Sequence, residues 1–253
     1  MRLIKSPAEI EVMRRAAAVS AEAHVAAMRA ARPGAWEYEI EALIEYTFRR
    51  HGAAGPAYPP IVAAGANATI LHYTTNDRQL AADELLLVDA GAELDFYCAD
   101  ITRTFPTGAR FAGRQRDLYA LVLAAQEAAI AAVRPGAPFD APHQRAVRVL
   151  AEGLVALGLL TGPADAVVEQ ERYKPLYMHR TSHWLGMDVH DVGLEPGVYV
   201  SDCLEDVDPR WHGIGVRIED DVLVTADGGE VLTAAVPKAI DAIEAIRGEG
   251  LAG

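Results

Sequence analysis

The sequence lacks the features that mark secreted, membrane-spanning or disulfide-stabilised proteins. It has only two cysteines, Cys98 and Cys203, without the close spacing of a zinc knuckle or a redox pair, so we expect a reducing compartment. No stretch approaches the roughly 18 apolar residues of a membrane span, and the N-terminal residues contain no apolar signal core. We therefore predict a cytoplasmic protein that makes no membrane contact.

Positive charge is scarce as well. The chain has 23 lysine and arginine residues against 36 aspartate and glutamate residues, which gives a formal net charge of −13. Such a chain repels nucleic acid phosphates and anionic lipids, and no basic cluster offsets the repulsion. We expect no nucleic acid partner and favour a small or peptide-sized one. With 253 residues, 51% of them hydrophobic, the chain can bury a sizeable core.

The order of helix and strand signals indicates an α+β fold. Ser6, Pro7 and Glu9 form an N-cap, a first-turn proline and a capping-box glutamate, so a helix is expected to begin there. Periodic apolar residues predict helices that end near Ala31, that run from Trp36 to Arg50, and that cover about 114–133. Apolar or alternating runs separated by turn residues predict antiparallel strands at 61–64, 84–89 and 95–105.

The chain also resembles itself. Arg32-Pro33-Gly34 and Arg134-Pro135-Gly136 interrupt two helix pairs at an offset of 102 residues, and strands follow each pair. The repeated order of elements predicts a duplicated helix-helix-sheet unit. We expect two halves, about 1–110 and 111–253, which are related by a pseudo-twofold axis and hold the functional site between them.

Acidic residues at strand ends are the first candidates for chemistry. Asp89 ends the apolar run 85–89, and Asp100 lies on the predicted strand 95–105, where it shares a face with Thr102 and Thr104. A hairpin can bring the two aspartates together. Taken alone, however, each of them could equally be an ordinary strand-end or turn aspartate.

Histidines and further carboxylates follow in the second half. His179, His183 and His190 lie within twelve residues, and a group of three is costly to bury without partners, which favours ligand or catalytic roles. Glu219 and Arg217 share one face of a strand and could be either a surface ion pair or part of a site. Four carboxylates and one imidazole, at Asp89, Asp100, His183, Glu195 and Glu219, would suit two divalent ions.

Five ordered motifs resemble those of a known family: LHYTTND, VDAGAELDFYCADITRTFP, HRTSHWLGMDVHDVG, EPGVYV and GIGVRIEDDVLVT. Together they resemble the catalytic domain of the proline-specific metallopeptidases, the Xaa-Pro aminopeptidases and prolidases, in the pita-bread family that includes methionine aminopeptidases. The resemblance covers nearly the whole chain. It implies one pita-bread catalytic domain over 1–253, and a di-metal exopeptidase that removes an N-terminal residue preceding proline. It also implies a homodimer.

The resemblance implies a role for each site residue. Asp89 resembles a bidentate ligand of one metal, Asp100 and Glu219 resemble bridging ligands, and His183 and Glu195 resemble ligands of the other metal. Manganese is expected, although cobalt and zinc accept the same ligands. Glu195 would also carry a proton. The residues implied to contact substrate in the same cleft are His72, His179, His190, Tyr199 and Arg217, and the three histidines are implied to be catalytic as well.

The chain departs from the family pattern in two places. Proline-specific aminopeptidases normally carry an N-terminal domain, and we expect it to be absent here. The family also has a strand of the form PGMVLTVEPG after the HDVG motif, whereas Gly193 and Leu194 run directly into Glu195. We therefore expect a missing core strand before Glu195 and exposed sheet edges.

Two alternatives remain open at this stage. One is a prolidase that acts on Xaa-Pro dipeptides, which differs in whether residues beyond the proline are tolerated. The other is a non-catalytic binding protein on the pita-bread scaffold. The shortened segment favours this second alternative, and the retained ligand residues oppose it.

Overall fold

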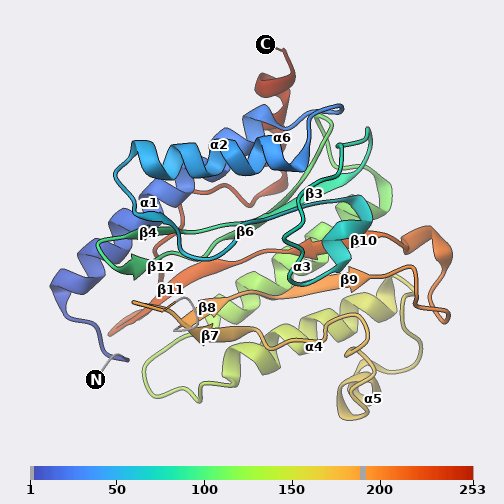
Figure 1. Ribbon diagram of the computed structural model, residues 1–253. Coiled ribbons are helices and arrows are strands. Elements are labelled where there is room, and N and C mark those ends of the chain that lie inside the picture. Colours follow the sequence, from blue (N-terminus) through green and yellow to red (C-terminus); the bar gives the residue numbers. More distant parts are fainter. Residues whose placement is uncertain (1–2, 189–191, 253) are drawn as a thin grey trace.

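The helices enclose the strands in a layered α+β arrangement, as the computed structural model of residues 3–188 and 192–252 shows (Figure 1). Helices α1, α2 and α6 lie on one side of the strands, and α3, α4 and α5 lie on the other. None of the helices in these two ranges is long and apolar enough to cross a bilayer.

The predicted helix limits are confirmed to within a few residues. Ser6 and Glu9 form the expected capping box, in which the Ser6 backbone N–H donates to Glu9 Oε2 at 2.6 Å. The helical elements are α1 (Pro7–Ala30), α2 (Glu37–Arg50), α3 (Gly113–Ala131), α4 (Ala141–Ala156), α5 (Ala164–Glu169) and α6 (Ile240–Ala252), with the 3-10 helices η1 (Gly65–Thr69) and η2 (Pro209–Trp211).

The strands form four antiparallel groups, two from each half of the chain. The first half provides β1-β4-β5 and β2-β3-β6, and the second half provides β10-β9 and β12-β11-β8-β7. The strands are β1 (Gly55–Pro56), β2 (Ile61–Ala64), β3 (Leu85–Asp89), β4 (Ala92–Leu94), β5 (Tyr97–Cys98), β6 (Thr102–Pro106), β7 (Ser182–Trp184), β8 (Val192–Leu194), β9 (Gly197–Val200), β10 (Ile214–Arg217), β11 (Asp220–Thr225) and β12 (Gly228–Val231).

The predicted strand 95–105 is wrong as one element, because it is interrupted between β5 and β6. Asp100 lies in this interruption, and its backbone N–H donates to both oxygens of the Asp221 carboxyl group at 3.3 Å. The hydroxyl groups of Thr102 and Thr104 contact Glu219 and the Arg217 carbonyl. The interruption therefore faces the second half of the chain.

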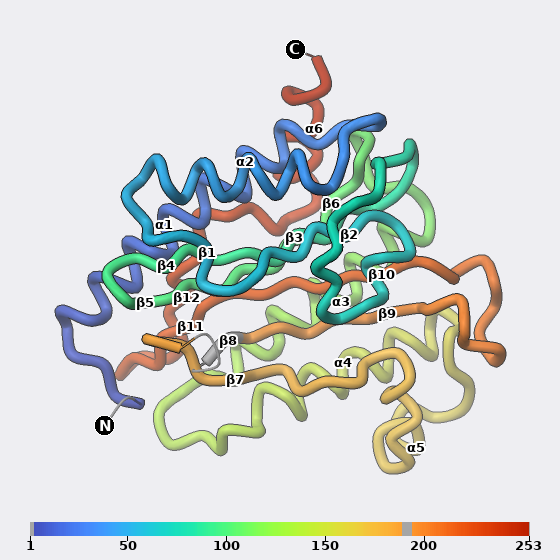
Figure 2. Tube along the Cα trace, viewed as in Figure 1, coloured from blue at the N-terminus to red at the C-terminus, as the bar shows by residue number. Residues whose placement is uncertain are grey.

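The two Arg-Pro-Gly turns have the same geometry, which agrees with the duplication. Ala35 N–H donates to the Arg32 carbonyl and Ala137 N–H donates to the Arg134 carbonyl, both at 3.1 Å. Gly34 and Gly136 both have positive φ, at 91° and 77°. Each turn ends one helix of a pair, and the two pairs cover opposite sides of the strands (Figure 2).

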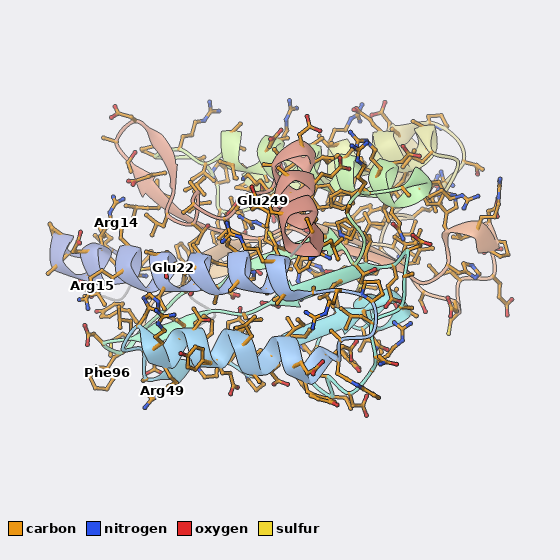
Figure 3. All side chains as sticks on the ribbon, turned by 90° about the horizontal axis from the view of Figure 1, so that it is seen from above. Arg14, Arg15, Glu22, Arg49, Phe96 and Glu249 are labelled. Atoms are coloured by element: carbon orange, nitrogen blue, oxygen red, sulfur yellow. The ribbon has the colours of Figure 1, made fainter. Side chains whose placement is uncertain are left out.

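Apolar side chains from both halves form one large buried cluster. Leu86 and Phe105 come from the first half, and Val198 and Val216 come from the second. Seen from above, α1 and α2 lie side by side (Figure 3), and Glu22 Oε2 on α1 lies 3.0 Å from Nε2 of His51 at the end of α2. The shared core keeps the two halves together, so that a site between them has fixed walls.

The expectation of a missing strand before Glu195 is wrong for the described residues. Residues Val192–Leu194 form β8, which pairs with β7 on one side and β11 on the other. Leu194 lies opposite Ser182 and Asp220, so a short strand fills the place between these two strands. His190, by contrast, lies outside the described residues.

Replacing Gly34 or Gly136 by alanine tests the equivalence of the two turns. Each change should lower the free energy of unfolding by about 1 kcal/mol, because alanine is strained at positive φ. At both positions a Cβ would meet nothing within 4 Å, so urea unfolding measures the backbone effect alone. Gly108→Ala is the control, since its Cβ also meets nothing and its φ lies outside the left-handed region. Clearly unequal losses would contradict the equivalence.

Candidate metal centre and active site

A cavity of about 640 Å³ lies where the two halves meet. Six of the site residues predicted from the sequence line it. They come from loops and strand ends of both halves: His72, Asp89, Asp100, His183, Glu195 and Glu219. The other described lining residues are Ala57, Tyr58, Pro59, Ile61, Thr74, Glu93, Cys98, Met187 and Asp188.

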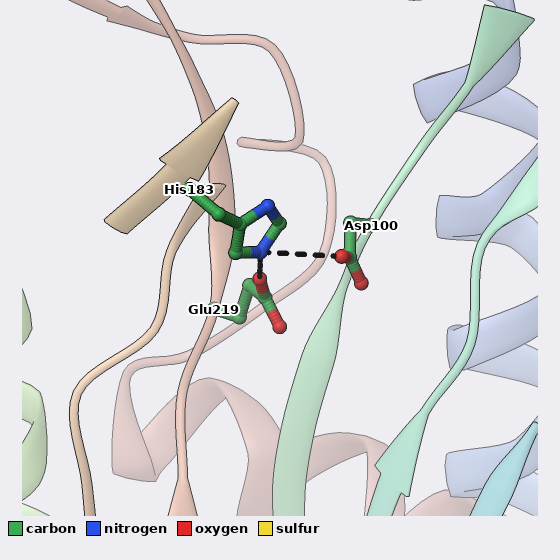
Figure 4. Close-up of side chains that lie close together, drawn as sticks. All are labelled: Asp100, His183 and Glu219. Carbon is green, nitrogen blue, oxygen red and sulfur yellow. Dashed lines mark hydrogen bonds and ion pairs between the residues drawn. The ribbon is translucent and has the colours of Figure 1, made fainter. Parts of the chain in front are cut away.

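Three side chains converge closely enough to hold one metal ion. His183 Nε2 lies 3.2 Å from Glu219 Oε1 and 3.5 Å from Asp100 Oδ2 (Figure 4). One ligand atom from each of the three residues lies within 4.8 Å of the others. His183 comes from β7, Asp100 from the β5–β6 interruption, and Glu219 from the two-residue link between β10 and β11.

Glu195 extends this cluster. Its Oε1 lies 3.8 Å from His183 Nε2, and its backbone N–H donates to the Thr181 carbonyl at 2.7 Å. This bond ties the residue after β8 to the residue before β7. The connection before Glu195 is shorter than in the family pattern, but it still places Glu195 at the cavity.

Asp89 is held from two sides. Arg217 Nη2 donates to Asp89 Oδ2 at 2.7 Å, and the Tyr58 hydroxyl donates to Asp89 Oδ1 at 2.6 Å. The Tyr58 oxygen also lies within hydrogen-bond distance of Asp100 Oδ1. A tyrosine has a single hydroxyl proton, so one of these two contacts needs a proton from an aspartate. Tyr58 thus bridges the two aspartates.

The buried carboxyl groups repel one another, and their pKa values show it. Burial and the charges of Glu219 and Asp89 raise the pKa of Asp100 well above its usual value. Burial and the charge of Glu219 raise the pKa of Glu195 to about 8. Burial lowers the pKa of His183, but its hydrogen bond to Glu219 and the nearby negative charges outweigh this effect and raise it to about 9.

This donor set fits divalent cations. Carboxylate oxygens with one imidazole suit ions of the manganese, cobalt and zinc type. The excess of negative charge in the cavity is what bound cations would neutralise. The chemistry and the convergence of Asp100, His183 and Glu219 therefore make this a candidate metal centre.

Buried residues that sequence patterns did not single out hold these ligands. Arg103 has no exposed surface. It donates to the Glu219 carbonyl at 2.5 Å and to Asp220 Oδ1 at 2.6 Å. Asp220 in turn accepts a bond from Lys238 at 2.7 Å. Arg103 and Tyr58 carry no local pattern of their own, since their partners lie far away in the sequence.

Tyr199 and Arg217, which the resemblance places in the cleft, are not among the described lining residues. They lie behind it, at 1% and 3% exposure. The buried position of Arg217 has an electrostatic reason, because a guanidinium removed from water requires hydrogen-bond acceptors for its N–H groups. Arg217 finds them in Asp89, Thr102 Oγ1 at 3.1 Å and the Tyr199 hydroxyl at 3.1 Å.

His179 is not among the described lining residues either, but its Nδ1 lies 4.0 Å from Glu195 Oε1 and its ring is next to Tyr199. Its Nδ1 lies 2.9 Å from the Arg180 carbonyl, which can only accept, so Nδ1 carries the proton. Burial lowers the pKa of His179 to about 4. The ring is then neutral near pH 7, and Nε2 accepts from the Tyr199 hydroxyl at 2.8 Å. Both ring nitrogens have partners, so His179 orients Tyr199 in this structure.

The titration of Glu195 and His183 predicts how pH affects the metal-free protein. Both groups bind protons more tightly in the folded than in the unfolded chain, so their stabilising contribution is lost as pH rises through about 8 and 9. Between pH 7 and pH 9 the chelated protein should lose roughly 1 kcal/mol of unfolding free energy per pH unit. Manganese should reverse this trend, because its ligands bind in their deprotonated forms.

Urea unfolding at pH 7, 8 and 9, with a chelator or with manganese, measures this effect. The variant Glu195→Gln, which removes one of the two titrating groups, should show a smaller pH dependence without metal. A chelated protein that becomes more stable as pH rises over this range would contradict the assignment.

Comparison with known proteins identifies the family. Residues 11–226 match the model of metallopeptidase family M24. The Xaa-Pro aminopeptidase of Haemophilus influenzae is 48% identical over 261 residues, which include 96% of this chain and 60% of that protein. The Xaa-Pro aminopeptidase of Escherichia coli is 44% identical over 263 residues, with 97% and 59% covered. The aligned regions of 261 and 263 residues are longer than this chain of 253 residues. The relatives therefore contain residues within the aligned region that have no counterpart here.

Solved structures agree with the sequence comparison. The Pseudomonas aeruginosa aminopeptidase PepP has a TM-score of 0.98 and 49% identity, and the match covers 100% of this chain and 61% of that one. A variant of Escherichia coli aminopeptidase P in complex with substrate also has a TM-score of 0.98, at 42% identity and the same coverage. The chain spans about three fifths of the length of these relatives. The predicted resemblance is confirmed, and the chain belongs to metallopeptidase family M24 and has its pita-bread fold.

Proposed function

We propose that the protein is a metal-dependent exopeptidase that removes an N-terminal residue preceding proline. The main support is that Asp89, Asp100, His183, Glu195 and Glu219, from both halves of the chain, line one cavity. Two relatives named Xaa-Pro aminopeptidase are 48% and 44% identical to this chain over the matched regions. The proposal concerns the catalytic unit, since the relatives are longer.

We propose that five residues hold two divalent ions. Asp89 would bind one ion, His183 and Glu195 the other, and Asp100 and Glu219 both. Manganese is our proposal for the cell, although the ligands also accept zinc, and a zinc-substituted structure of the Escherichia coli relative has been solved. Bound ions would supply an activated water and polarise the scissile carbonyl.

The chain itself would supply proton transfer and orientation. Glu195, with a pKa of about 8 before any ion binds, can hold a proton near neutral pH and could pass it to the leaving proline nitrogen. Arg217 and Tyr58 fix the Asp89 carboxylate through opposite oxygens. Fixed ligands keep their geometry during the reaction, which is the usual contribution of such supporting residues.

His72 is the described histidine best placed for substrate. It is exposed and lines the cavity, so a peptide in the cavity could reach it. Structures of Escherichia coli aminopeptidase P have been solved in complex with substrate and with the inhibitor Pro-Leu. We propose that His72, together with His190, binds a peptide with proline in second position, whereas His179 acts through Tyr199.

The two alternatives are less well supported. The binding-protein alternative depended on a missing strand, and β8 occupies that place. The prolidase alternative differs only in substrate length, and the relatives are named aminopeptidases. A homodimer and a cytoplasmic location stay predictions.

Hydrolysis of Ala-Pro-Ala by chelated and then manganese-reloaded protein tests the proposal. We expect manganese-dependent release of alanine, with little cleavage of Ala-Pro or Ala-Ala-Ala, measured by chromatography of the products. Cleavage of the dipeptide alone would support the prolidase alternative. The absence of turnover in every assay would contradict a peptidase function.

Glu219→Gln should reduce turnover by more than the roughly 100-fold that is typical of residues that only orient a ligand, because it removes an oxygen ligand shared by both ions. Glu230→Gln is the matched control, since Glu230 pairs with Arg14 on the surface and lines no part of the cavity. Equal activities of the two variants would exclude Glu219 as a ligand.

A further inference from the structure

Glu37, which is not among the predicted site residues, has an unusual environment. It is the first residue of α2, and its side chain has no exposed surface. The four groups in the described residues that hydrogen-bond to its carboxylate are all donors. Oε1 accepts from Ala64 N–H at 2.7 Å and Asn67 Nδ2 at 3.0 Å, and Oε2 accepts from the Tyr73 hydroxyl at 2.7 Å and Arg78 N–H at 2.9 Å.

These four donors belong to one segment, residues 64–78. The regular structure between β2 and residue 78 is the short helix η1, so much of this segment has no strand partner to define its path. His72 and Thr74 on this segment line the candidate cavity. The position of the cavity wall therefore depends on side-chain contacts, and Glu37 provides four of them.

Tyr73 links Glu37 most directly to the cavity wall. Its side chain is 8% exposed and its hydroxyl is bound to Glu37 Oε2, whereas the neighbouring His72 is exposed. Because the two residues are consecutive, a fixed Tyr73 limits the positions that the His72 backbone can occupy. Loss of the Glu37 contact would allow His72 to move relative to the ligand residues.

Asn76 is a second buried anchor of the same segment. Asn76 is 1% exposed. It accepts from Val62 N–H at 3.0 Å and donates to the Pro60 carbonyl at 2.9 Å. Its φ is +48°, so the chain turns sharply there. These bonds tie the segment to the residues that follow Tyr58, which bridges Asp89 and Asp100.

We propose that Glu37 is a positioning residue for substrate binding, which holds the segment 64–78 so that His72 meets the peptide at a fixed distance from the ligand residues. The proposal rests on the proposed function, because it assumes that His72 binds the peptide. A purely structural carboxylate would affect stability but would not change affinity through His72. The two roles can therefore be separated.

Glu37→Gln keeps the shape of the side chain but turns one acceptor into a donor. Since all four partners donate, the amide leaves one pair of buried donors without an acceptor. We expect about tenfold weaker binding of the dipeptide prolyl-alanine and a similar rise in KM for Ala-Pro-Ala, with kcat changed less than about threefold. The affinity for manganese, measured by calorimetry, should not change. Wild-type affinity for prolyl-alanine would overturn the proposal.

Glu39→Gln is the matched control. Glu39 lies in the same first turn of α2 and is exposed, and its carboxylate accepts from Trp36 N–H at 2.7 Å. Its replacement weakens a helix cap, so the melting temperature should fall slightly while KM stays at the wild-type value. An equal rise in KM in this variant would show that any weakening of α2 has the same effect, and would overturn a specific role for Glu37.

A double-mutant cycle with His72→Ala tests whether Glu37 acts through His72. If it does, Glu37→Gln should weaken prolyl-alanine binding less than about twofold in the His72→Ala background, because the affected contact is already absent. A full tenfold loss in that background would overturn the proposal. Should Glu37→Gln fail to fold, Tyr73→Phe removes one of the four bonds and should show the same pattern at about threefold.

Hydrogen exchange gives a readout independent of catalysis. Amides of residues 70–78 should exchange faster in Glu37→Gln than in wild type, and those of β3 should not. Unchanged exchange in residues 70–78 would overturn the role of Glu37 and leave the proposed function intact. Wild-type protein that neither binds prolyl-alanine nor cleaves Ala-Pro-Ala would overturn the proposed function, and the substrate role of Glu37 with it.

Discussion

The mutual repulsion of buried carboxyl groups is the constraint on which the rest of the site depends. Asp89, Asp100, Glu195 and Glu219 line one cavity, with the imidazole of His183 among them. Charges that are removed from water in this way must be neutralised by protons, by cations or by hydrogen-bond donors. The raised pKa values of Asp100 and Glu195 show the first solution, and the convergence on His183 shows where a divalent ion would provide the second.

Buried residues around the cavity neutralise these carboxyl groups or hydrogen-bond to the residues that carry them. Arg217 neutralises Asp89 directly, and Arg103 holds the backbone of Glu219 and the side chain of Asp220. Both arginines are almost fully buried, and their partners come from both halves of the chain. The contact between the halves is therefore not only apolar. The carboxyl groups that we propose as metal ligands also require the two halves to meet.

The shortened connection before Glu195 shows how little chain such a site needs. Three residues form β8 between β7 and β11, and the next residue is already a cavity residue. The backbone bond from Glu195 to Thr181 fixes the exit of this strand. Relatives contain residues without a counterpart here, yet the pairing of the sheet persists across the described part.

The sequence by itself determined the features that depend on neighbouring residues. The capping box at Ser6, the ends of α1 to α3, strands β2 and β3, and the two Arg-Pro-Gly turns follow from periodicity and turn chemistry within a few residues. The ordered motifs also pointed to the five residues that we propose as metal ligands. Tertiary structure alone decided the interruption at Asp100, the place of β8, the positions of Tyr199 and Arg217 behind the cavity, and the roles of Tyr58, Arg103 and Glu37. These features depend on partners from about 10 to more than 100 residues away, and the pattern within a single helix or strand does not record such partners.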